Sequence, residues 1–277
     1  MKKTLFAVAK TAAPILNTPA FDQVFARTDL SFDNQGLLRA VETVVFPATK
    51  MTILENCSPH IVRVRIPQDY PYGDNLYADC RFLTAAQENT PERPLRMPAT
   101  NFIIQQLEKM LGMRYIWGGN VPSVPELISF YPPDKSLHQL DPLARDTRLL
   151  QGVDCSGLIY FATLGATPRN TSNFVTFGKP VHIENLSCAE IIFKLKPLDA
   201  IVWPGHVVIV LNSHQAIESR AGFGVIITDL YQRLAEILQT RKPANAWESS
   251  PPNTNIFVVR RWHPEFFNGY NKQLPAR

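Results

Sequence analysis

Cys155 is the residue with the clearest chemical potential, because it sits in the run Asp154-Cys155-Ser156-Gly157 and apolar residues at helical spacing follow it. This pattern places Cys155 in the first turn of a helix. Unpaired N–H groups and the positive end of the helix dipole stabilise a thiolate there, and a thiol pKa near 8.5 can fall to about 3.5–7.5. Cys155 is therefore a candidate nucleophile. The alternative is a buried cysteine that acts as a small apolar side chain.

A thiolate nucleophile needs a partner that carries a proton to the leaving amine, and His206 is the best candidate. It follows Pro204-Gly205 and begins the apolar run 207–211. The next expected strand, 215–217, leads to Glu218, whose carboxylate could accept a hydrogen bond from the His206 ring and fix its tautomer. Two alternatives for Glu218 are a solvated charge and an ion pair with Arg220.

The first 86 residues contain short segments that alternate at period two, 39–45, 51–54 and 61–66, separated by turn formers. These predict strands, and several strands at this spacing predict a small β-barrel. Residues 5–8 also predict a strand rather than a signal peptide, because Lys10 interrupts the apolar run. The polar stretch 87–94 contains two prolines, and residues 87–98 are the predicted linker to a second domain, 99–277.

After the linker, apolar residues recur at three and four positions, which predicts a helix that Thr100 caps and Gly112 ends. Residues 121–153 follow, with several prolines and no clear period. A stretch this long in a compact domain is often functional, so it could be a lid or a site wall, or it could be a surface insertion.

The composition and charge of the chain argue against several classes of function. The formal net charge of +4 is small and scattered over 277 residues, so no nucleic-acid partner is expected. The four cysteines are widely spaced without a Cys-x-x-Cys pair or clustered histidines, so free thiols are expected and no metal site or other cofactor is. No run approaches the roughly 18 apolar residues of a membrane span.

Five motifs follow one another along the chain: Tyr115-Ile116-Trp117-Gly118-Gly119, Asp154-Cys155-Ser156-Gly157-Leu158, Thr167-Pro168-Arg169-Asn170-Thr171-Ser172, Lys196-Pro197-Leu198-Asp199 and Gly205-His206-Val207. In these motifs and in their order, roughly residues 98–262 resemble the NlpC/P60 cysteine peptidases, and the N-terminal part with Leu16-Asn17-Thr18-Pro19 resembles a bacterial SH3 domain. The resemblance implies an α+β protein, with an SH3-like small β-barrel in front of a papain-like catalytic domain.

The resemblance further implies hydrolysis of the amide between the γ-carboxyl of D-glutamate and the diamino acid in peptidoglycan stem peptides, through a thioester on Cys155. His206 would be the general base and acid, and the Cys155 N–H with the Tyr115 hydroxyl would hold the oxyanion. Peptidoglycan-derived peptides with a free N-terminal L-alanine are the expected partners, and Asp154 and Ser156 would bind the amine. The other substrate-binding residues that the motifs imply are Trp117, Arg169 and Ser172.

Two features depart from the family pattern. The third catalytic residue is usually His, Asn or Gln, whereas Glu218 stands at the matching position, and the segment 121–153 is longer than usual. Two other functions stay open: a catalytically inactive wall-binding module, and a Cys-His amidase or acyltransferase acting on another amide. A free-amine requirement and the weak leader favour a cytoplasmic enzyme that recycles wall peptides, with an envelope role as the alternative.

Overall fold

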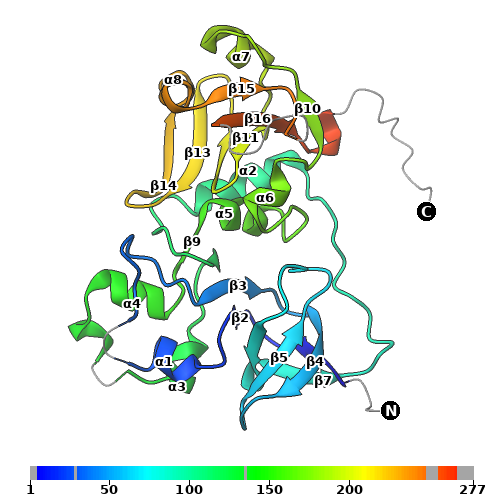
Figure 1. Ribbon diagram of the computed structural model, residues 1–277, viewed down its shortest axis with the longest axis vertical. Coiled ribbons are helices and arrows are strands. Elements are labelled where there is room, and N and C mark those ends of the chain that lie inside the picture. The colour runs from blue at the N-terminus through cyan, green and yellow to red at the C-terminus, as the bar shows by residue number, and fades with distance from the viewer. Residues whose placement is uncertain (1–4, 28–29, 134–135, 248–254, 267–277) are drawn as a thin grey trace.

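The computed structural model describes residues 5–27, 30–133, 136–247 and 255–266 (Figure 1). Helices and mainly antiparallel strands are mixed, in agreement with the predicted mixed class. One large sheet is formed by the N-terminal strands and another by the C-terminal strands, and the two lie at opposite ends of the view in Figure 1. A short pair, β8 (Asn120–Val121) and β9 (Gly152–Val153), lies between them.

The N-terminal sheet has the strand order β3-β2-β6-β5-β4-β1-β7, and its described strand pairs are antiparallel. The predicted barrel is not closed, because the end strands β3 and β7 do not pair within the described residues. The outer edge of β3 is instead occupied by the Asn120 side chain, which hydrogen bonds the backbone of Val44. The strands are β1 (Leu5–Ala9), β2 (Ala13–Leu16), β3 (Val41–Val45), β4 (Lys50–Asn56), β5 (Ile61–Arg65), β6 (Leu76–Asp79) and β7 (Leu83–Ala86).

The strands predicted at 5–8, 39–45, 51–54 and 61–66 are confirmed as β1, β3, β4 and β5. Strand β1 pairs with both β4 and β7, so its backbone forms hydrogen bonds along both edges. The stretch 87–98 contains no helix or strand, as expected of a linker. Arg93 nevertheless attaches this linker to the rest of the protein, because it forms an ion pair with Asp69 and a hydrogen bond to the carbonyl of Leu164.

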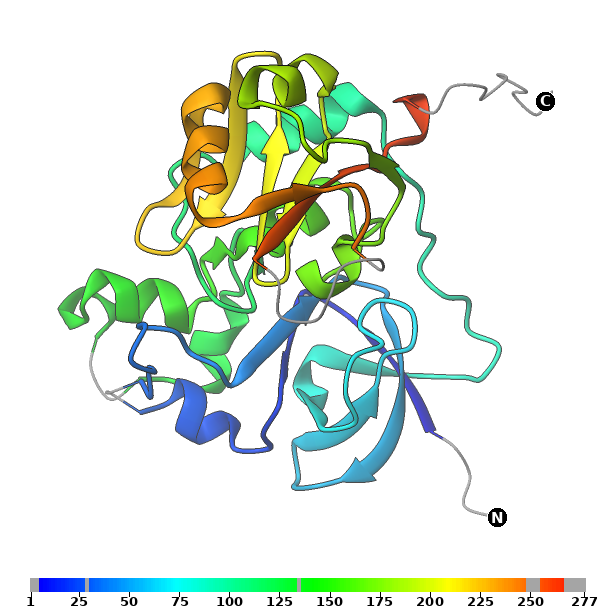
Figure 2. The ribbon, with the colours of Figure 1, turned by 45° about the horizontal axis from the view of Figure 1, so that its top comes forward.

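The C-terminal sheet has the order β10-β16-β11-β12-β13-β14, and β15 pairs with β16 in parallel. Helices cover both faces (Figure 2): α2 (Thr100–Lys109) and α5 (Cys155–Ala162) on one, α7 (Cys188–Lys194) and α8 (Leu230–Thr240) on the other. The strands are β10 (Lys179–Val181), β11 (Ala200–Trp203), β12 (His206–Val210), β13 (Gln215–Arg220), β14 (Gly224–Asp229), β15 (Lys242–Ala244) and β16 (Ile256–Arg261).

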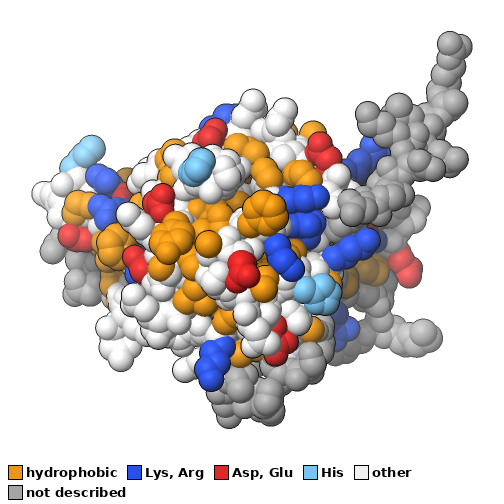
Figure 3. Space-filling view, turned by 90° about the horizontal axis from the view of Figure 1, so that it is seen from above, with side chains coloured by type: hydrophobic (Ala, Val, Ile, Leu, Met, Phe, Trp, Pro, Cys, Tyr) orange, Lys and Arg blue, Asp and Glu red, His pale blue; other side chains and the backbone are white. Residues whose placement is uncertain are grey.

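Alternation along these strands separates the two cores, because successive side chains point to opposite faces. Val207 and Ile209 pack with the α2 and α5 side, whereas Val208 and Val210 pack with the α7 and α8 side. The surface at the α7 and α8 end mixes apolar and charged side chains (Figure 3), and Phe193 and Tyr231 are exposed.

The helix predicted after the linker is confirmed as α2, with Ile103, Leu107 and Met110 buried. The predicted Thr100 cap is wrong. Ala99 is the N-cap and makes no side-chain cap, while the Thr100 hydroxyl hydrogen bonds to Glu265, a residue that is distant in the sequence. Gly112 follows the helix with φ +77°, the left-handed conformation typical of a helix terminator.

The described residues of the segment 121–153 form three short helices, although its sequence shows no clear period: α3 (Glu126–Phe130), η2 (Leu137–Gln139) and α4 (Pro142–Arg148). It belongs to the N-terminal core, where Tyr131 packs against Phe21 and Phe25 of α1 (Phe21–Phe25). Arg148 is 1% exposed and its guanidinium donates to the carbonyl of Phe25. The segment is therefore packed against the first 86 residues, below the C-terminal sheet in Figure 1.

None of the described helices is long and apolar enough to cross a membrane.

Candidate active site

Cys155 is the first residue of α5, as its sequence context predicts. Asp154 is the N-cap and accepts a hydrogen bond from the N–H of Gly157 at 2.7 Å. A glycine is required at 157, because a Cβ there would lie 2.0 Å from the carbonyl oxygen of Gly119. The close approach of these two backbones fixes where the helix begins.

The Cys155 thiol lies against the backbone on both sides of His206. It donates to the carbonyl of Gly205 at 3.7 Å, and the N–H of Val207 hydrogen bonds the sulfur. Gly205 is held in turn by its N–H, which donates to the Thr171 hydroxyl at 2.9 Å. The helix start and the mouth of β12 thus meet at the sulfur.

The expected fall in the pKa of Cys155 is wrong for this structure. Burial and the neighbouring Asp154 charge raise the pKa to about 12, although Arg169 and the N–H groups of Ser156 and Val207 lower it. The residue is only 7% exposed, so the loss of hydration outweighs the helix terminus. A thiol with such a pKa is protonated near neutral pH, and it would need a base to remove its proton before it could act as a nucleophile.

His206 and Glu218 are in contact, with Nε2 of the ring 2.6 Å from the carboxylate. The pairing of β12 with β13 ends at Ile209 with Ile217, so the two strands are no longer paired at His206 and Glu218. The Ser219 hydroxyl instead donates to the carbonyl of Val153, just before Asp154 and Cys155. The start of α5 is thereby anchored where the two strands separate.

Glu218 is neither a solvated charge nor a partner of Arg220. It is 0% exposed, and its carboxylate accepts hydrogen bonds from Arg233 of α8 at 2.6 and 2.9 Å. Burial raises its pKa, but the hydrogen bonds and charges of His206 and Arg233 outweigh burial and lower the pKa overall. Arg220 contacts Glu236 instead, at 3.6 Å.

The contact between Arg233 and Glu218 was not predicted from the sequence, although the position of Arg233 in its helix gives an indication of it. It falls on the apolar stripe of α8 together with Leu230, Leu234 and Ile237, all of them buried. A charged residue at a position that helical periodicity assigns to the core needs a buried partner of opposite charge.

Asp154 and Arg169 form a second buried ion pair, with bonds of 2.6 and 3.0 Å between guanidinium and carboxylate. Asp154 is 6% exposed, and its oxygens also accept from the N–H groups of Gly118 and Gly157. A substrate ammonium would have to compete with Arg169 for this carboxylate. Arg169 is 2% exposed, and it also donates to Ser156, itself 5% exposed.

This buried network reaches into the N-terminal sheet. Arg169 Nε donates to the Thr43 hydroxyl of β3 at 3.0 Å, and Thr43 donates to Asn120 at 3.1 Å. The Asn120 amide completes the link through two hydrogen bonds with the backbone of Val44. The N-terminal sheet therefore supports the residues that flank Cys155.

The remaining predicted residues lie at different depths. Tyr115 is partly buried, and burial together with the charges of Cys155 and Asp154 raises its pKa, which indicates that the phenol is near the thiol. Trp117 is partly exposed and stacks under the Arg39 guanidinium at 3.9 Å. Ser172 is exposed, and its hydroxyl donates to the side chain of its neighbour Asn173 at 3.2 Å.

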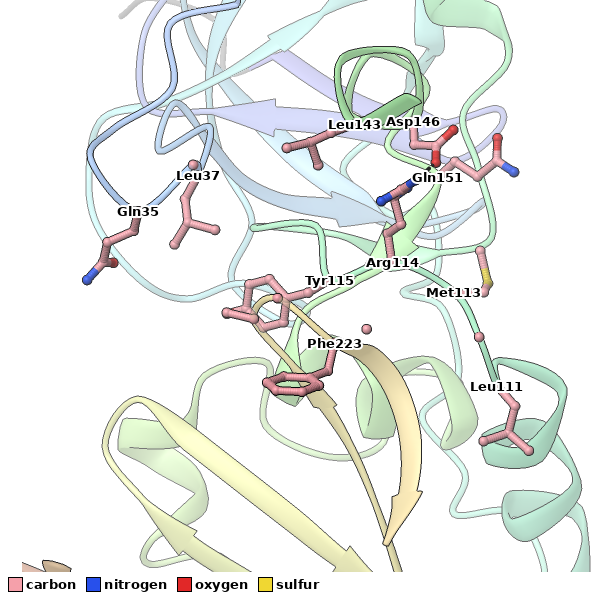
Figure 4. Close-up of a pocket in the computed structure, with 15 residues that line it drawn as sticks. Gln35, Leu37, Leu111, Met113, Arg114, Tyr115, Leu143, Asp146, Gln151 and Phe223 are labelled. Carbon is pink, nitrogen blue, oxygen red and sulfur yellow. Dashed lines mark hydrogen bonds and ion pairs between the residues drawn. The ribbon is translucent and has the colours of Figure 1, made fainter. Parts of the chain in front are cut away.

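A cavity of about 750 Å³ adjoins this cluster at Tyr115 (Figure 4). Its walls come from the loop with Gln35 and Leu37, from Arg114, paired with Asp146 at 2.6 Å, and from the hairpin between β13 and β14. Segment 121–153 supplies Leu143, Asp146 and Gln151. Part of that segment therefore walls a cavity beside Tyr115, in addition to its packing on the N-terminal core.

No group of three or more His, Cys, Asp or Glu side chains in the described parts of the chain is arranged to hold a metal ion.

No family model matches the sequence, and no curated protein matches it. Among solved structures, the chain is similar to an NlpC/P60 family protein from Bacillus cereus, with 17% identity and a TM-score of 0.36 over 94% of this chain. The match covers 64% of that protein, so this chain spans less than two thirds of its length.

Two further structures are similar. One is a P60 domain from an M. avium paratuberculosis antigen, with 18% identity and a TM-score of 0.32 over 47% of this chain and 82% of that one. The other is NlpC1 from Trichomonas vaginalis, with 14% identity and a TM-score of 0.34 over 94% of this chain and 69% of that one.

Proposed function

We propose that this chain is an NlpC/P60-type cysteine peptidase that hydrolyses the γ-D-glutamyl-diamino acid amide of peptidoglycan stem peptides. The observation that carries the proposal is the placement of Cys155 at the start of α5, against the carbonyl of Gly205 and the N–H of Val207, on either side of His206, whose ring contacts Glu218. Burial raises the pKa of the thiol, so it needs a general base, and His206, the residue between these two backbone contacts, is the proposed base.

In the first half of the reaction, the Cys155 sulfur attacks the amide carbonyl carbon while its proton passes to the His206 imidazole. The resulting imidazolium gives that proton to the departing amine as the C–N bond breaks, which leaves a thioester on Cys155. Water then attacks the thioester, His206 takes the proton from the water, and the carboxylic acid is released as the thiol re-forms.

The oxyanion of the tetrahedral intermediate forms at the N-terminus of α5. The backbone N–H of Cys155 belongs to the first turn, whose N–H groups have no partner within the helix. Together with the Tyr115 hydroxyl, it would supply the two donors that stabilise the developing charge.

Within this proposal the N-terminal strands are an SH3-like unit, residues 1–86, joined through 87–98 to a papain-like catalytic domain, 99–277. The bonds from Thr43 and Val44 to Arg169 and Asn120 make the N-terminal sheet a support for the catalytic residues. Recognition of a free N-terminal L-alanine by Asp154 and Ser156, with Trp117, Arg169 and Ser172 nearby, is part of the same proposal, as is a role in cytoplasmic recycling.

The test is incubation of L-alanyl-γ-D-glutamyl-diaminopimelate with the protein under reducing conditions. The products are separated by chromatography and identified by mass spectrometry. We expect release of the diamino acid, and loss of release in Cys155→Ala and His206→Ala. An intact peptide with the wild-type protein would refute the hydrolase, and release by Cys155→Ala would refute the nucleophile. N-acetylation of the alanine tests the free amine separately.

A further inference from the structure

The Glu218 carboxylate is held by more than His206. With 0% exposure it has no contact with solvent, and an isolated charge in such a place is strongly unfavourable. Arg233 compensates for it, with Nε 2.6 Å from one oxygen and Nη2 2.9 Å from the other. This bidentate geometry fixes the plane of the carboxylate as well as stabilising its charge.

The surroundings of the pair contain few other charges. Arg233 Nη1 also contacts Glu236 at 3.0 Å, and Arg220 contacts Glu236 from β13 at 3.6 Å. On the β11 side, the Trp203 ring lies 5.3 Å from the His206 ring, and Arg241 stacks over Trp203 at 4.6 Å. Among these arginines, within the part of the chain that the structure describes, Arg233 is the one that hydrogen bonds Glu218.

We propose that Arg233 is a positioning residue of the His206–Glu218 pair, which keeps the carboxylate ionised and aimed at Nε2 of the ring. The Nδ1 nitrogen is then the ring nitrogen that does not contact the carboxylate. The inference rests on the proposed function for its role in turnover, but the charge coupling between Arg233 and His206 is a property of the folded protein and is measurable without substrate.

The coupling has a defined sign. Arg233 places a positive charge next to the pair, and this charge opposes protonation of His206 and of Glu218 alike. Replacement of Arg233 by Met removes that opposition, so the pair holds its proton to a higher pH. A lysine at position 233 restores the positive charge but cannot form the bidentate contact. A glutamine at 218 is neutral and needs no counter-charge, so Glu218→Gln and Arg233→Met should compensate for each other.

The experiment has two parts. In Cys155→Ser protein, the His206 ring is titrated by NMR, with its signal assigned through His206→Gln, and we expect the apparent pKa to rise by about one pH unit or more in Arg233→Met. Arg220→Met is the matched control, since it removes an arginine of the same cluster that does not touch Glu218, and it should leave the titration unchanged.

Turnover of the stem peptide gives the second readout. We expect Arg233→Met to lower kcat about tenfold or more with little change in KM, Arg233→Lys to recover part of the loss, and the double variant Glu218→Gln, Arg233→Met to exceed both single variants. An unchanged His206 titration in Arg233→Met, or a double variant as poor as the product of the single losses, would overturn the proposal. If the wild type leaves the peptide intact, the proposed function fails while the titration still decides the role of Arg233.

Discussion

The buried ion pair between Arg169 and Asp154 offers the most direct energetic test of the site. Replacement of Arg169 by Met leaves the 6% exposed Asp154 carboxylate without a counter-charge and removes two bonds of 2.6 and 3.0 Å. Breaking a buried pair on one side costs about 3–5 kcal/mol. The loss of bonds to Ser156 and Thr43 acts in the same direction.

The measurement is urea unfolding followed by tryptophan fluorescence and circular dichroism. With a slope of about 3 kcal/mol per M, the upper end for small proteins, the midpoint of Arg169→Met should fall by about 1–1.7 M. The control is Arg63→Met, which removes an arginine whose partner Glu55 is exposed, with a contact of 3.2 Å. Such surface pairs contribute about 0–1 kcal/mol, so the control should shift little.

A double variant tests separately whether the charge of Arg169 stabilises the fold. If the cost of Arg169→Met comes from a stranded carboxylate, then Asp154→Asn combined with it should lose less than the sum of the two single losses, by about 1 kcal/mol or more. An Arg169→Met shift no larger than that of Arg63→Met would refute the buried pair. Strict additivity would show that Arg169 acts through its size and not through its charge.

Three further predictions concern the same region. Alkylation of Cys155 by iodoacetamide, followed by peptide mass mapping, should rise about tenfold per pH unit from 7 to 10, because its pKa is raised to about 12; a plateau below pH 9, as for a thiol of pKa near 8.5, would contradict this. Asn120→Ala should cost about 2–3 kcal/mol in urea unfolding, because it strands the buried N–H and carbonyl of Val44; a cost under about 0.5 kcal/mol would count against the link. Gly157→Ala should cost about 1–3 kcal/mol and lower peptide release about tenfold, because its Cβ would meet the Gly119 carbonyl at 2.0 Å; full activity in a folded variant would contradict the close contact.

Local patterns predicted the elements well where one segment carries its own signal. The period-two segments became β3, β4 and β5, and α5 begins at Cys155. The segment 121–153 did not show its helices, because they are only 3 to 7 residues long and their buried residues pack on the N-terminal core. An element of one or two turns is too short to display a period.

Residue types and spacing suffice to identify the residues that could react and their order, because they place a cysteine at the start of a helix and a histidine at the start of a strand. The charges around these residues follow from the tertiary structure. Burial raised the pKa of Cys155 instead of lowering it, and residues 15 apart in sequence supplied the counter-charges, Arg169 for Asp154 and Arg233 for Glu218. Desolvation and ion pairing depend on distance in space, and a linear pattern does not contain that distance.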